Sequence, residues 1–228
     1  MKLIFIHASG GTKESWYHQT KYFKDAEAID LPGHSEGKPC TSINDYVQWV
    51  RGYIYGRGYR DVVLAGHSLG GGIAQLYALQ YPEELKALIL IGTGARLRVL
   101  PATLEALEGA LDDKESWERG IRAGYAFLEP EERETLRKKR AAMGPQIVLN
   151  DQLCCDRFDI MDRVHEIELP TLLICGTEDT QTPVKYTEYL ANKIDGAKMV
   201  IIEGATHSVP MEKPDEVNGA IEGFLKSL

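Results

Sequence analysis

Short apolar runs alternate with longer amphipathic stretches along most of this 228-residue chain. Such alternation is typical of βαβ units, in which successive strands join one parallel sheet. The runs at 62–65 and 88–91 contain only valine, leucine, isoleucine and alanine, which suits strands covered by helices on both faces. We therefore predict an α/β fold, a mostly parallel sheet flanked by helices. Its strands are expected at about 2–7, 26–30, 61–66, 86–92, 170–175 and 198–203.

Helical patterns fill the stretches between these strands. Thr41-Ser42 followed by Asp45 is typical of a helix start, because a serine or threonine at the N-cap accepts a hydrogen bond from an amide of the first turn. Pro183 and Pro214 suit the first turns of two later helices, where the amide that proline lacks has no partner within the helix.

One long segment interrupts the alternation. Between about 95 and 167 the chain shows helical patterns, broken by prolines, but no convincing strand. We interpret 95–167 as a helical insertion that divides the core domain into 1–94 and 168–228.

The composition argues against several classes of protein. Hydrophobic residues make up 43% and charged residues 26%, as in ordinary soluble proteins. Acidic residues outnumber basic ones by 34 to 26, whereas a nucleic-acid groove needs an excess of lysine and arginine. No run reaches the roughly 18 apolar residues that span a bilayer, and the first run is too short for a signal peptide. We expect a cytoplasmic protein that binds neither nucleic acid nor membrane; its oligomeric state is not indicated.

Motifs for metals and cofactors are missing from the sequence. The four cysteines lack the spacing of a zinc cluster or a disulfide framework, and the six histidines form no H-E-x-x-H pattern. No G-x-G-x-x-G follows the first strand. We expect no metal site and no cofactor.

The strongest local signal is the segment Gly66-His67-Ser68-Leu69-Gly70, which lies between an apolar run and a helical pattern. A sharp turn from strand to helix needs small neighbours to tolerate strained backbone angles, and it projects the Ser68 hydroxyl from the sheet edge. The Leu69 amide then lies at a helix amino terminus, where it can stabilise an oxyanion. The alternative is a glycine-rich turn with an incidental serine.

A serine nucleophile needs a base within hydrogen-bond reach and an acid that orients this base. His207 lies in a loop after the run at 199–202, and the loop after 172–175 contains the adjacent carboxylates Glu178 and Asp179. Because catalytic groups of open α/β sheets gather at the carboxyl ends of the strands, these candidates are expected to meet Ser68.

The order serine, acid, histidine resembles that of the α/β-hydrolase superfamily. Residues 30–35 resemble its D-x-P-G-H-G/S loop, and Gly204-x-x-His207 resembles its histidine loop. Residues 176–183 match its G-x-x-D-x-x-x-P acid loop, which selects Asp179 over Glu178. The resemblance covers almost the whole chain and implies that 95–167 is a cap over the active site.

Two departures from the family pattern concern the start of the chain. The family usually has a β-hairpin before the strand that carries its oxyanion loop, whereas here this strand begins near Met1, so we predict an α/β-hydrolase fold shortened by one or two strands. Where the family usually has a His-Gly pair, this chain has His7-Ala8. The alanine makes a backbone conformation with positive φ more costly than glycine would. By position, Ser9 supplies the second oxyanion amide beside that of Leu69.

The resemblance implies a carboxylesterase-like serine hydrolase that cleaves a small ester or related acyl substrate through an acyl-enzyme. His207 is the expected base, Asp179 orients it, and the amides of Leu69 and Ser9 stabilise the oxyanion. Two alternatives stay open, a ligand receptor that keeps the triad and a C–C hydrolase or lyase on the same fold.

Large apolar side chains of the insertion are candidates for an apolar substrate pocket, although they can equally pack its helices together. The candidate substrate-binding residues are Trp117, Tyr125, Phe127, Met143 and Val209. The basic run 137–140 follows several glutamates, which predicts a solvated helix face.

Overall fold

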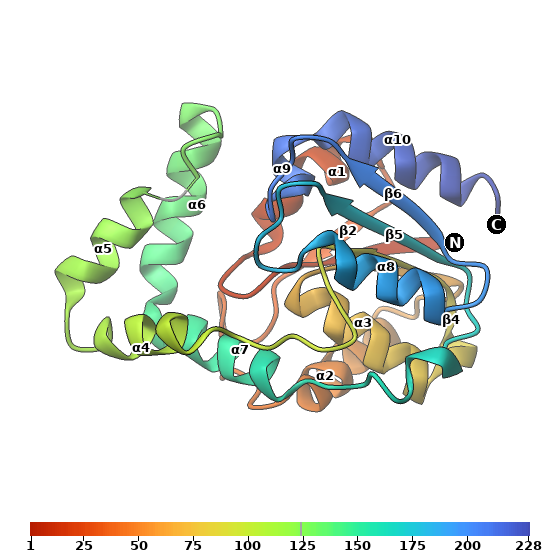
Figure 1. Ribbon diagram of the computed structural model, residues 1–228, viewed down its shortest axis with the longest axis horizontal. Coiled ribbons are helices and arrows are strands. Elements are labelled where there is room, and N and C mark those ends of the chain that lie inside the picture. The colour runs from red at the N-terminus through yellow and green to blue at the C-terminus, as the bar shows by residue number, and fades with distance from the viewer. Residues whose placement is uncertain (124) are drawn as a thin grey trace.

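The computed structural model describes residues 1–123 and 125–228 and shows a six-stranded parallel sheet between two layers of helices (Figure 1). Each strand end lies within one residue of its predicted position, and the predicted fold class is confirmed. The strands are β1 (Lys2–Ile6), β2 (Glu27–Ile29), β3 (Val62–His67), β4 (Leu85–Ile91), β5 (Thr171–Gly176) and β6 (Lys198–Ile202).

The strand order is β2-β1-β3-β4-β5-β6. The chain passes from β1 to β2 on one side and returns through β3 on the other, so the order reverses between β1 and β3. At such a point the connections leave toward opposite faces and open a crevice at the carboxyl ends of the strands. The loops after β1 and β3 border this crevice. Within the described part of the chain β1 is the first strand.

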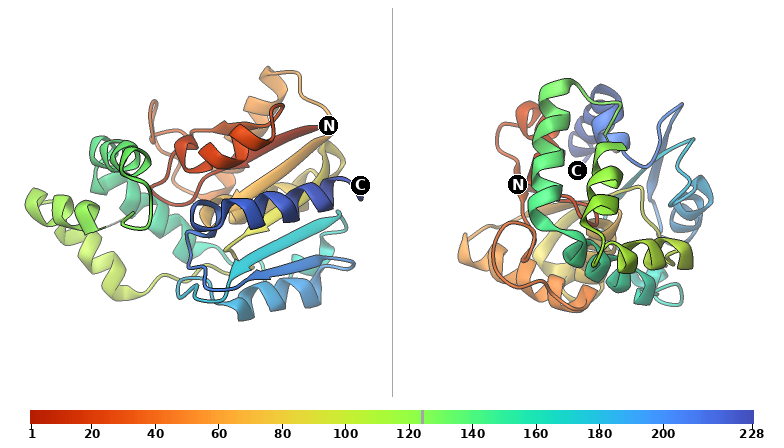
Figure 2. Two further views of the ribbon diagram at one scale, coloured as in Figure 1. Left: turned by 90° about the horizontal axis from the view of Figure 1, so that it is seen from above. Right: turned by 90° about the vertical axis from the view of Figure 1, so that its left-hand side faces the viewer.

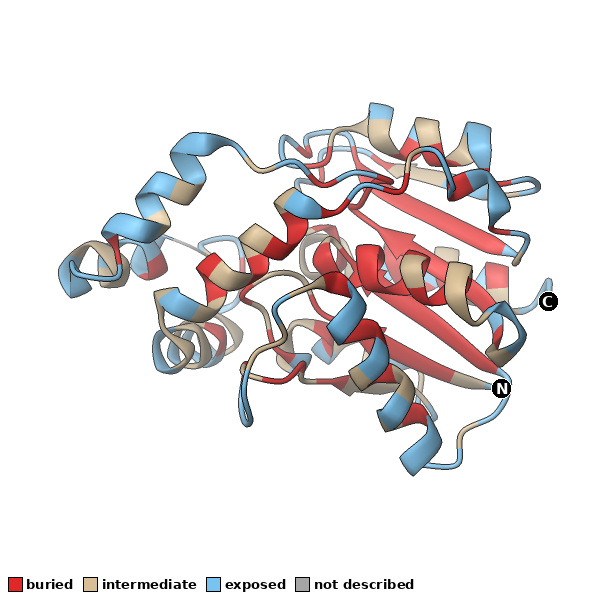
Figure 3. Cartoon of the chain, turned by 90° about the horizontal axis from the view of Figure 1, so that it is seen from below, coloured by how far each residue is buried: buried red, intermediate tan, exposed pale blue. Residues whose placement is uncertain are grey.

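Helices cover both faces of the sheet (Figures 1 and 3). One face carries α2 (Ile43–Gly56), α3 (Leu69–Gln80) and α8 (Val184–Lys193); the other carries α1 (Tyr17–Tyr22), α9 (Val209–Glu212) and α10 (Pro214–Leu225). Short 3-10 turns, η1 to η3, lie at Lys13–Trp16, Pro82–Glu84 and Val164–Glu166.

The predicted helix starts are close to those observed. The Ser42 hydroxyl accepts a hydrogen bond from the Asp45 amide at 3.1 Å, and α10 begins at Pro214. Pro183 lies one residue before α8, because its backbone is extended with ψ 156°.

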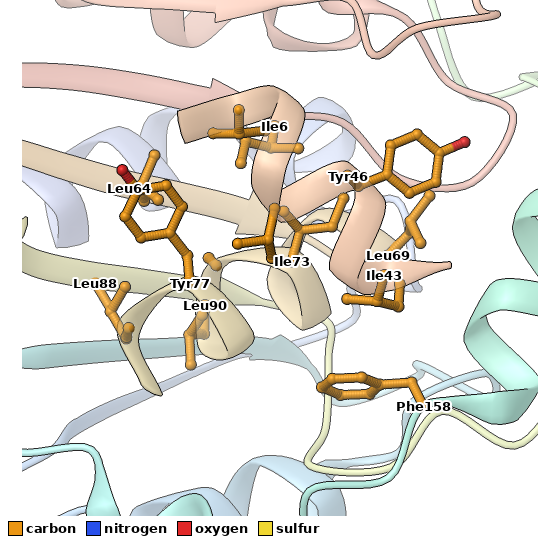
Figure 4. Close-up of a cluster of buried hydrophobic side chains, with 14 of the residues drawn as sticks. Ile6, Ile43, Tyr46, Leu64, Leu69, Ile73, Tyr77, Leu88, Leu90 and Phe158 are labelled. Atoms are coloured by element: carbon orange, nitrogen blue, oxygen red, sulfur yellow. The ribbon is translucent and has the colours of Figure 1, made fainter. Parts of the chain in front are cut away.

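Two hydrophobic clusters hold the layers together, one on each face of the sheet. Val62 and Leu64 of β3 belong to the cluster under α2 and α3, part of which is drawn in Figure 4. Val63 and Ala65 belong to the cluster under α10. Because neighbouring side chains of a strand point to opposite faces, a strand covered on both sides must be apolar throughout.

Between β4 and β5 the described residues form four α-helices and the short turn η3. The helices are α4 (Pro101–Gly109), α5 (Lys114–Ala123), α6 (Pro130–Met143) and α7 (Pro145–Arg157). Helices α4, α5 and α6 stand beyond the end of the sheet opposite both chain termini (Figures 1 and 2), whereas residues 158–167 run back along the core, where Val164 is completely buried. None of the helices described is both long and apolar enough to cross a membrane.

Candidate active site

Ser68 occupies a sharp turn between β3 and α3. Its backbone has φ 53° and ψ −113°, a strained conformation for a residue with a side chain. A β-carbon at Gly66 would lie 2.2 Å from the carbonyl oxygen of Gly70, and one at Gly70 would lie 2.3 Å from that of Ile6. The two glycines therefore allow the start of α3 to approach β3 and β1, and the turn presents Ser68 at the carboxyl edge of the sheet.

His207 and Asp179 form a hydrogen-bonded pair beyond the ends of β6 and β5. The distance from Nδ1 of His207 to Oδ2 of Asp179 is 2.8 Å, and the carboxylate is fully buried. Its other oxygen accepts from the amides of Gln181 and Thr182 at 2.9 and 2.8 Å. The neighbouring Glu178 is exposed and lies outside this pair.

The environment of Asp179 keeps its carboxylate ionised. Burial by itself would raise the pKa of Asp179, but its hydrogen bond and charge interaction with His207 and its hydrogen bonds with Thr182 outweigh this effect. The net pKa lies below the ordinary value. An ionised carboxylate at Nδ1 keeps that nitrogen protonated, which leaves Nε2 as the atom that can accept a proton.

Ser68 and His207 line one hollow of about 180 Å³. Ser9 of the loop after β1 and residues of α6 and α7 form other parts of its wall. Among the described residues, Ser68 and His207 share no hydrogen bond, so a proton transfer between them needs a side-chain adjustment. Such bonds often tighten only when a substrate is bound. The structure therefore brings the predicted nucleophile and base to the same space.

The two predicted oxyanion residues also lie at this edge. Ser9 lines the hollow, and Leu69 begins α3, where the first amides have no partner within the helix. Ala8 does not adopt a positive φ; in this loop the positive φ of 61° falls on Gly10. The alanine that replaces the family's glycine is therefore accommodated without left-handed strain.

Three side chains of the insertion hold the loop after β1. The Gly10 amide donates to Oδ2 of Asp151 at 2.9 Å, and Arg140 donates from Nη1 to the Gly10 carbonyl at 3.1 Å. Gln152 donates from Nε2 to the Ser9 hydroxyl at 3.1 Å. We did not predict these contacts from the sequence, because they join positions 130 to 143 residues apart and no local pattern marks them.

Asp151 is completely buried and connects α7 to two loops of the core. Besides the Gly10 amide, its carboxylate accepts hydrogen bonds from His34 Nε2 and the Tyr46 hydroxyl, both at 2.8 Å. A buried carboxylate is costly unless hydrogen bonds and charges compensate for lost hydration. The three donors provide this compensation and fix the position of the loop.

Two other buried histidines stay neutral at pH 7. Burial, followed by the neighbouring His34, lowers the pKa of His7 to about 4. Burial, followed by His207, lowers the pKa of His67 to about 3. Both rings bond to the backbone: His7 accepts from the Leu31 amide at 3.0 Å, and His67 donates to the His207 carbonyl at 2.7 Å.

We expect the free energy of unfolding to fall as the pH is lowered from about 6.5 to about 5. Above this window both His7 and His67 are neutral in the folded and unfolded states, so neither contributes. Within it the unfolded chain binds protons that the folded chain excludes, and each histidine costs about 2 kcal/mol by pH 5. The contribution of Asp179 is lost only at lower pH, because its folded pKa is lowered from an ordinary value near 4.

Urea unfolding at pH 8, 6.5 and 5 measures this loss. A variant in which the exposed His165 is replaced by glutamine should keep the full pH dependence. Equal free energies of unfolding at pH 8 and pH 5 would contradict the prediction.

The structure brings one of the five predicted substrate-binding residues to the hollow. Tyr125 lines it, whereas Trp117 packs against the guanidinium of an arginine of α6. Phe127 is 47% exposed, Met143 is half-buried outside the lining, and Val209 is completely buried in the core under α10. A helical pattern shows that a position is apolar, but it does not show which space that position borders.

The basic run 137–140 is only partly solvated: three of its four residues, Arg137, Lys139 and Arg140, are half-buried, so our prediction of a solvated helix face was wrong for most of the run. Lys139 and Arg140 are half-buried and line the hollow, and Lys139 also pairs with Glu14 of η1 at 3.1 Å. Lys138 is the one residue of the run whose side chain is exposed. Alternating charges do not reveal that one side of a helix faces a distant loop.

Elsewhere the described residues offer little for a metal or for thiol chemistry. Among them, no three histidine, cysteine, aspartate or glutamate side chains lie together as a metal site requires. The four cysteines are free, and burial raises the pKa of Cys40 to about 11 and that of Cys154 to about 12. These two thiols are therefore protonated at neutral pH.

Comparisons with known proteins agree with this architecture. The model of the alpha/beta hydrolase family matches residues 3–220. A hydrolase of Acinetobacter baylyi, named for (E)-2-((N-methylformamido)methylene)succinate, is 25% identical, with 99% of this chain and 90% of the relative aligned. The monoacylglycerol lipase abhd6-A of Xenopus laevis is 24% identical over 99% of this chain and 75% of its own length.

Solved structures show the same relationship. A thermophilic esterase is 35% identical, with a TM-score of 0.82 over 99% of this chain and 89% of the other. A hydrolase from Pseudomonas aeruginosa is 25% identical, with a TM-score of 0.84 over 98% and 89%. The chain therefore belongs to the α/β-hydrolase family and is a hydrolase.

Proposed function

We propose that this hydrolase is a serine esterase that cleaves a small carboxylic ester through an acyl-enzyme. The observation that carries the proposal is the 2.8 Å hydrogen bond between His207 and Asp179 beside the hollow that Ser68 lines. A histidine held in this way acts as a base toward a serine hydroxyl, and the aspartate maintains the required tautomer.

The reaction follows from this arrangement. His207 Nε2 removes the proton of the Ser68 hydroxyl while Oγ attacks the acyl carbon. The amides of Leu69 and Ser9 stabilise the oxyanion of the tetrahedral intermediate. As this intermediate collapses, the bond to the alcohol breaks and the alcohol leaves with the proton from His207. Water then attacks the acyl-enzyme with His207 again as the base, which releases the acid and restores Ser68.

Three further observations support an esterase with a small substrate. The relative solved at 35% identity is an esterase. The hollow of about 180 Å³ has room for a short acyl group. The insertion 95–167 contributes wall residues to this hollow, which fits the role of a cap. The cytoplasmic location stays a prediction from the sequence.

A fluorophosphonate probe combined with an ester series tests the proposal. We expect the probe to modify the Ser68 hydroxyl, identified by mass spectrometry of the peptide, and to abolish hydrolysis of p-nitrophenyl acetate and butyrate. The unmodified enzyme should hydrolyse p-nitrophenyl octanoate more slowly than the acetate and the butyrate. Modification without steady-state turnover of any ester would favour a ligand receptor, and hydrolysis that survives modification would exclude Ser68 as the nucleophile.

A further inference from the structure

The hollow beside Ser68 has a charge opposite to that of the whole protein. The chain carries a formal net charge of −8, yet the charged side chains in the described lining of the hollow are Lys139 and Arg140, without an aspartate or glutamate. Asp179 lies behind His207 and is fully buried. A cleft lined by one sign of charge concentrates ligands of the opposite sign.

Arg140 is the less compensated of the two cations. Its Nη1 donates to the Gly10 carbonyl at 3.1 Å, and its Cζ lies 5.5 Å from the ring centroid of Trp117. Within the part of the chain described, Arg140 makes no ion pair with a carboxylate, whereas Lys139 pairs with Glu14 at 3.1 Å. A guanidinium has five N–H donors, and the Gly10 carbonyl uses one.

The position of Arg140 links it to the reaction centre. Gly10, which it contacts, directly follows Ser9, the residue proposed to supply an oxyanion amide. Arg140 lines the same small hollow as Ser68 and His207, and its guanidinium is held there by the carbonyl of Gly10, another wall residue. A substrate whose acyl carbon lies at Ser68 therefore has another part within the same hollow as Arg140.

We propose that Arg140, assisted by Lys139, binds a free carboxylate of the substrate. The preferred substrate is then a short carboxylic ester that carries a second, ionised carboxyl group, such as a half-ester of a small dicarboxylic acid. Arginine suits this role because its planar N–H pairs match both oxygens of a carboxylate. This inference rests on the proposed esterase function and adds a substrate class to it.

Two pairs of esters with nearly equal shape test the inference. Monoethyl succinate and ethyl levulinate differ in a carboxylate against a methyl ketone on the acyl part. Acetoxyacetate and acetoxyacetone differ in the same way on the alcohol part. In a pH-stat assay, wild-type kcat/KM for the anion of at least one pair should exceed that for its neutral partner by about tenfold or more, and added salt should reduce this preference.

The Arg140→Gln variant should lose most of this preference, by about tenfold or more in the ratio of kcat/KM values. The ratio is decisive because Arg140 also supports the loop through Gly10, and damage to the loop would lower the rates for both members of a pair. Lys138→Gln is the matched control, since it removes the same charge from an exposed position of α6 and should retain the wild-type ratio. Arg140→Lys should retain part of it.

Equal kcat/KM values within both pairs, or a ratio unchanged in Arg140→Gln, would overturn the inference. The fluorophosphonate reaction and hydrolysis of the neutral esters would still report the esterase function, so the two failures are distinguishable. Calorimetric binding of monoethyl succinate and acetoxyacetate to the Ser68→Ala protein adds a readout that needs no turnover. Binding of at least one of them that is lost in Ser68→Ala/Arg140→Gln supports the inference, and no binding of either to Ser68→Ala contradicts it.

Discussion

Replacing Ser68 with alanine is expected to lower kcat for p-nitrophenyl acetate by about a million-fold, which leaves only the small rate enhancement that substrate binding and the oxyanion amides provide. The oxygen that attacks the acyl carbon is then missing, and His207 and Asp179 have no hydroxyl to activate. Steady-state rates and fluorophosphonate modification measure this effect. The modification should be absent from Ser68→Ala. Both the rate and the modification should be normal in Ser35→Ala, which removes an exposed hydroxyl.

The Ser68→Ala protein should fold normally, because alanine at this turn has the same β-carbon and backbone requirement as serine. Circular dichroism and urea unfolding check this. A folded Ser68→Ala protein that hydrolyses the ester at the wild-type rate would refute the proposed mechanism.

Replacing Asp151 with alanine is expected to lower the free energy of unfolding by about 3–5 kcal/mol. The change removes a fully buried carboxylate and leaves three buried donors, from Gly10, His34 and Tyr46, without an acceptor. Urea unfolding at pH 8 measures the loss. Asp162→Ala removes an exposed carboxylate and should change the stability by no more than about 0.5 kcal/mol.

Asp151→Asn separates the support of the loop from the stability of the fold. The amide keeps an acceptor oxygen, but its NH₂ group must face either the Tyr46 hydroxyl or the donors of Gly10 and His34. We therefore expect a smaller loss of stability together with a fall in kcat, because the Gly10 amide adjoins the proposed oxyanion residue Ser9. An Asp151→Ala protein that unfolds within about 1 kcal/mol of the wild type would show that the network is not needed for stability.

The sheet was predictable because its signals are local. Each buried strand is an apolar run of four or more residues, and the alternation with helical patterns indicates parallel pairing. The turn at Ser68 was equally visible, because Gly66 and Gly70 flank the serine between an apolar run and a helical pattern. The structure adds the reason for the two glycines, since a β-carbon at either position would clash with the backbone. The exact helix starts were predicted less precisely, since α8 begins one residue after Pro183.

The surroundings of the candidate site were less accessible to sequence reasoning. Four of the predicted substrate-binding residues have the apolar character of a pocket lining, yet the structure places them outside the lining of the hollow: Trp117, Phe127, Met143 and Val209. No local sequence pattern marks Arg140 and Gln152 as wall residues, because their hydrogen-bond partners lie far away in the chain, in the loop after β1. An apolar or charged position reveals its preference for burial, but not its neighbours.

The sequence by itself determined the layers of this protein, the strained turn at Ser68 and the loops that carry Asp179 and His207. These features depend on residues close together in the chain, through side-chain periodicity and backbone sterics. Only the tertiary structure decided that Asp151 and Arg140 of the insertion hold the loop after β1 and that a positive hollow lies beside Ser68. These contacts join distant segments, and their free energy comes from packing and desolvation that arise only when α6 and α7 meet the core.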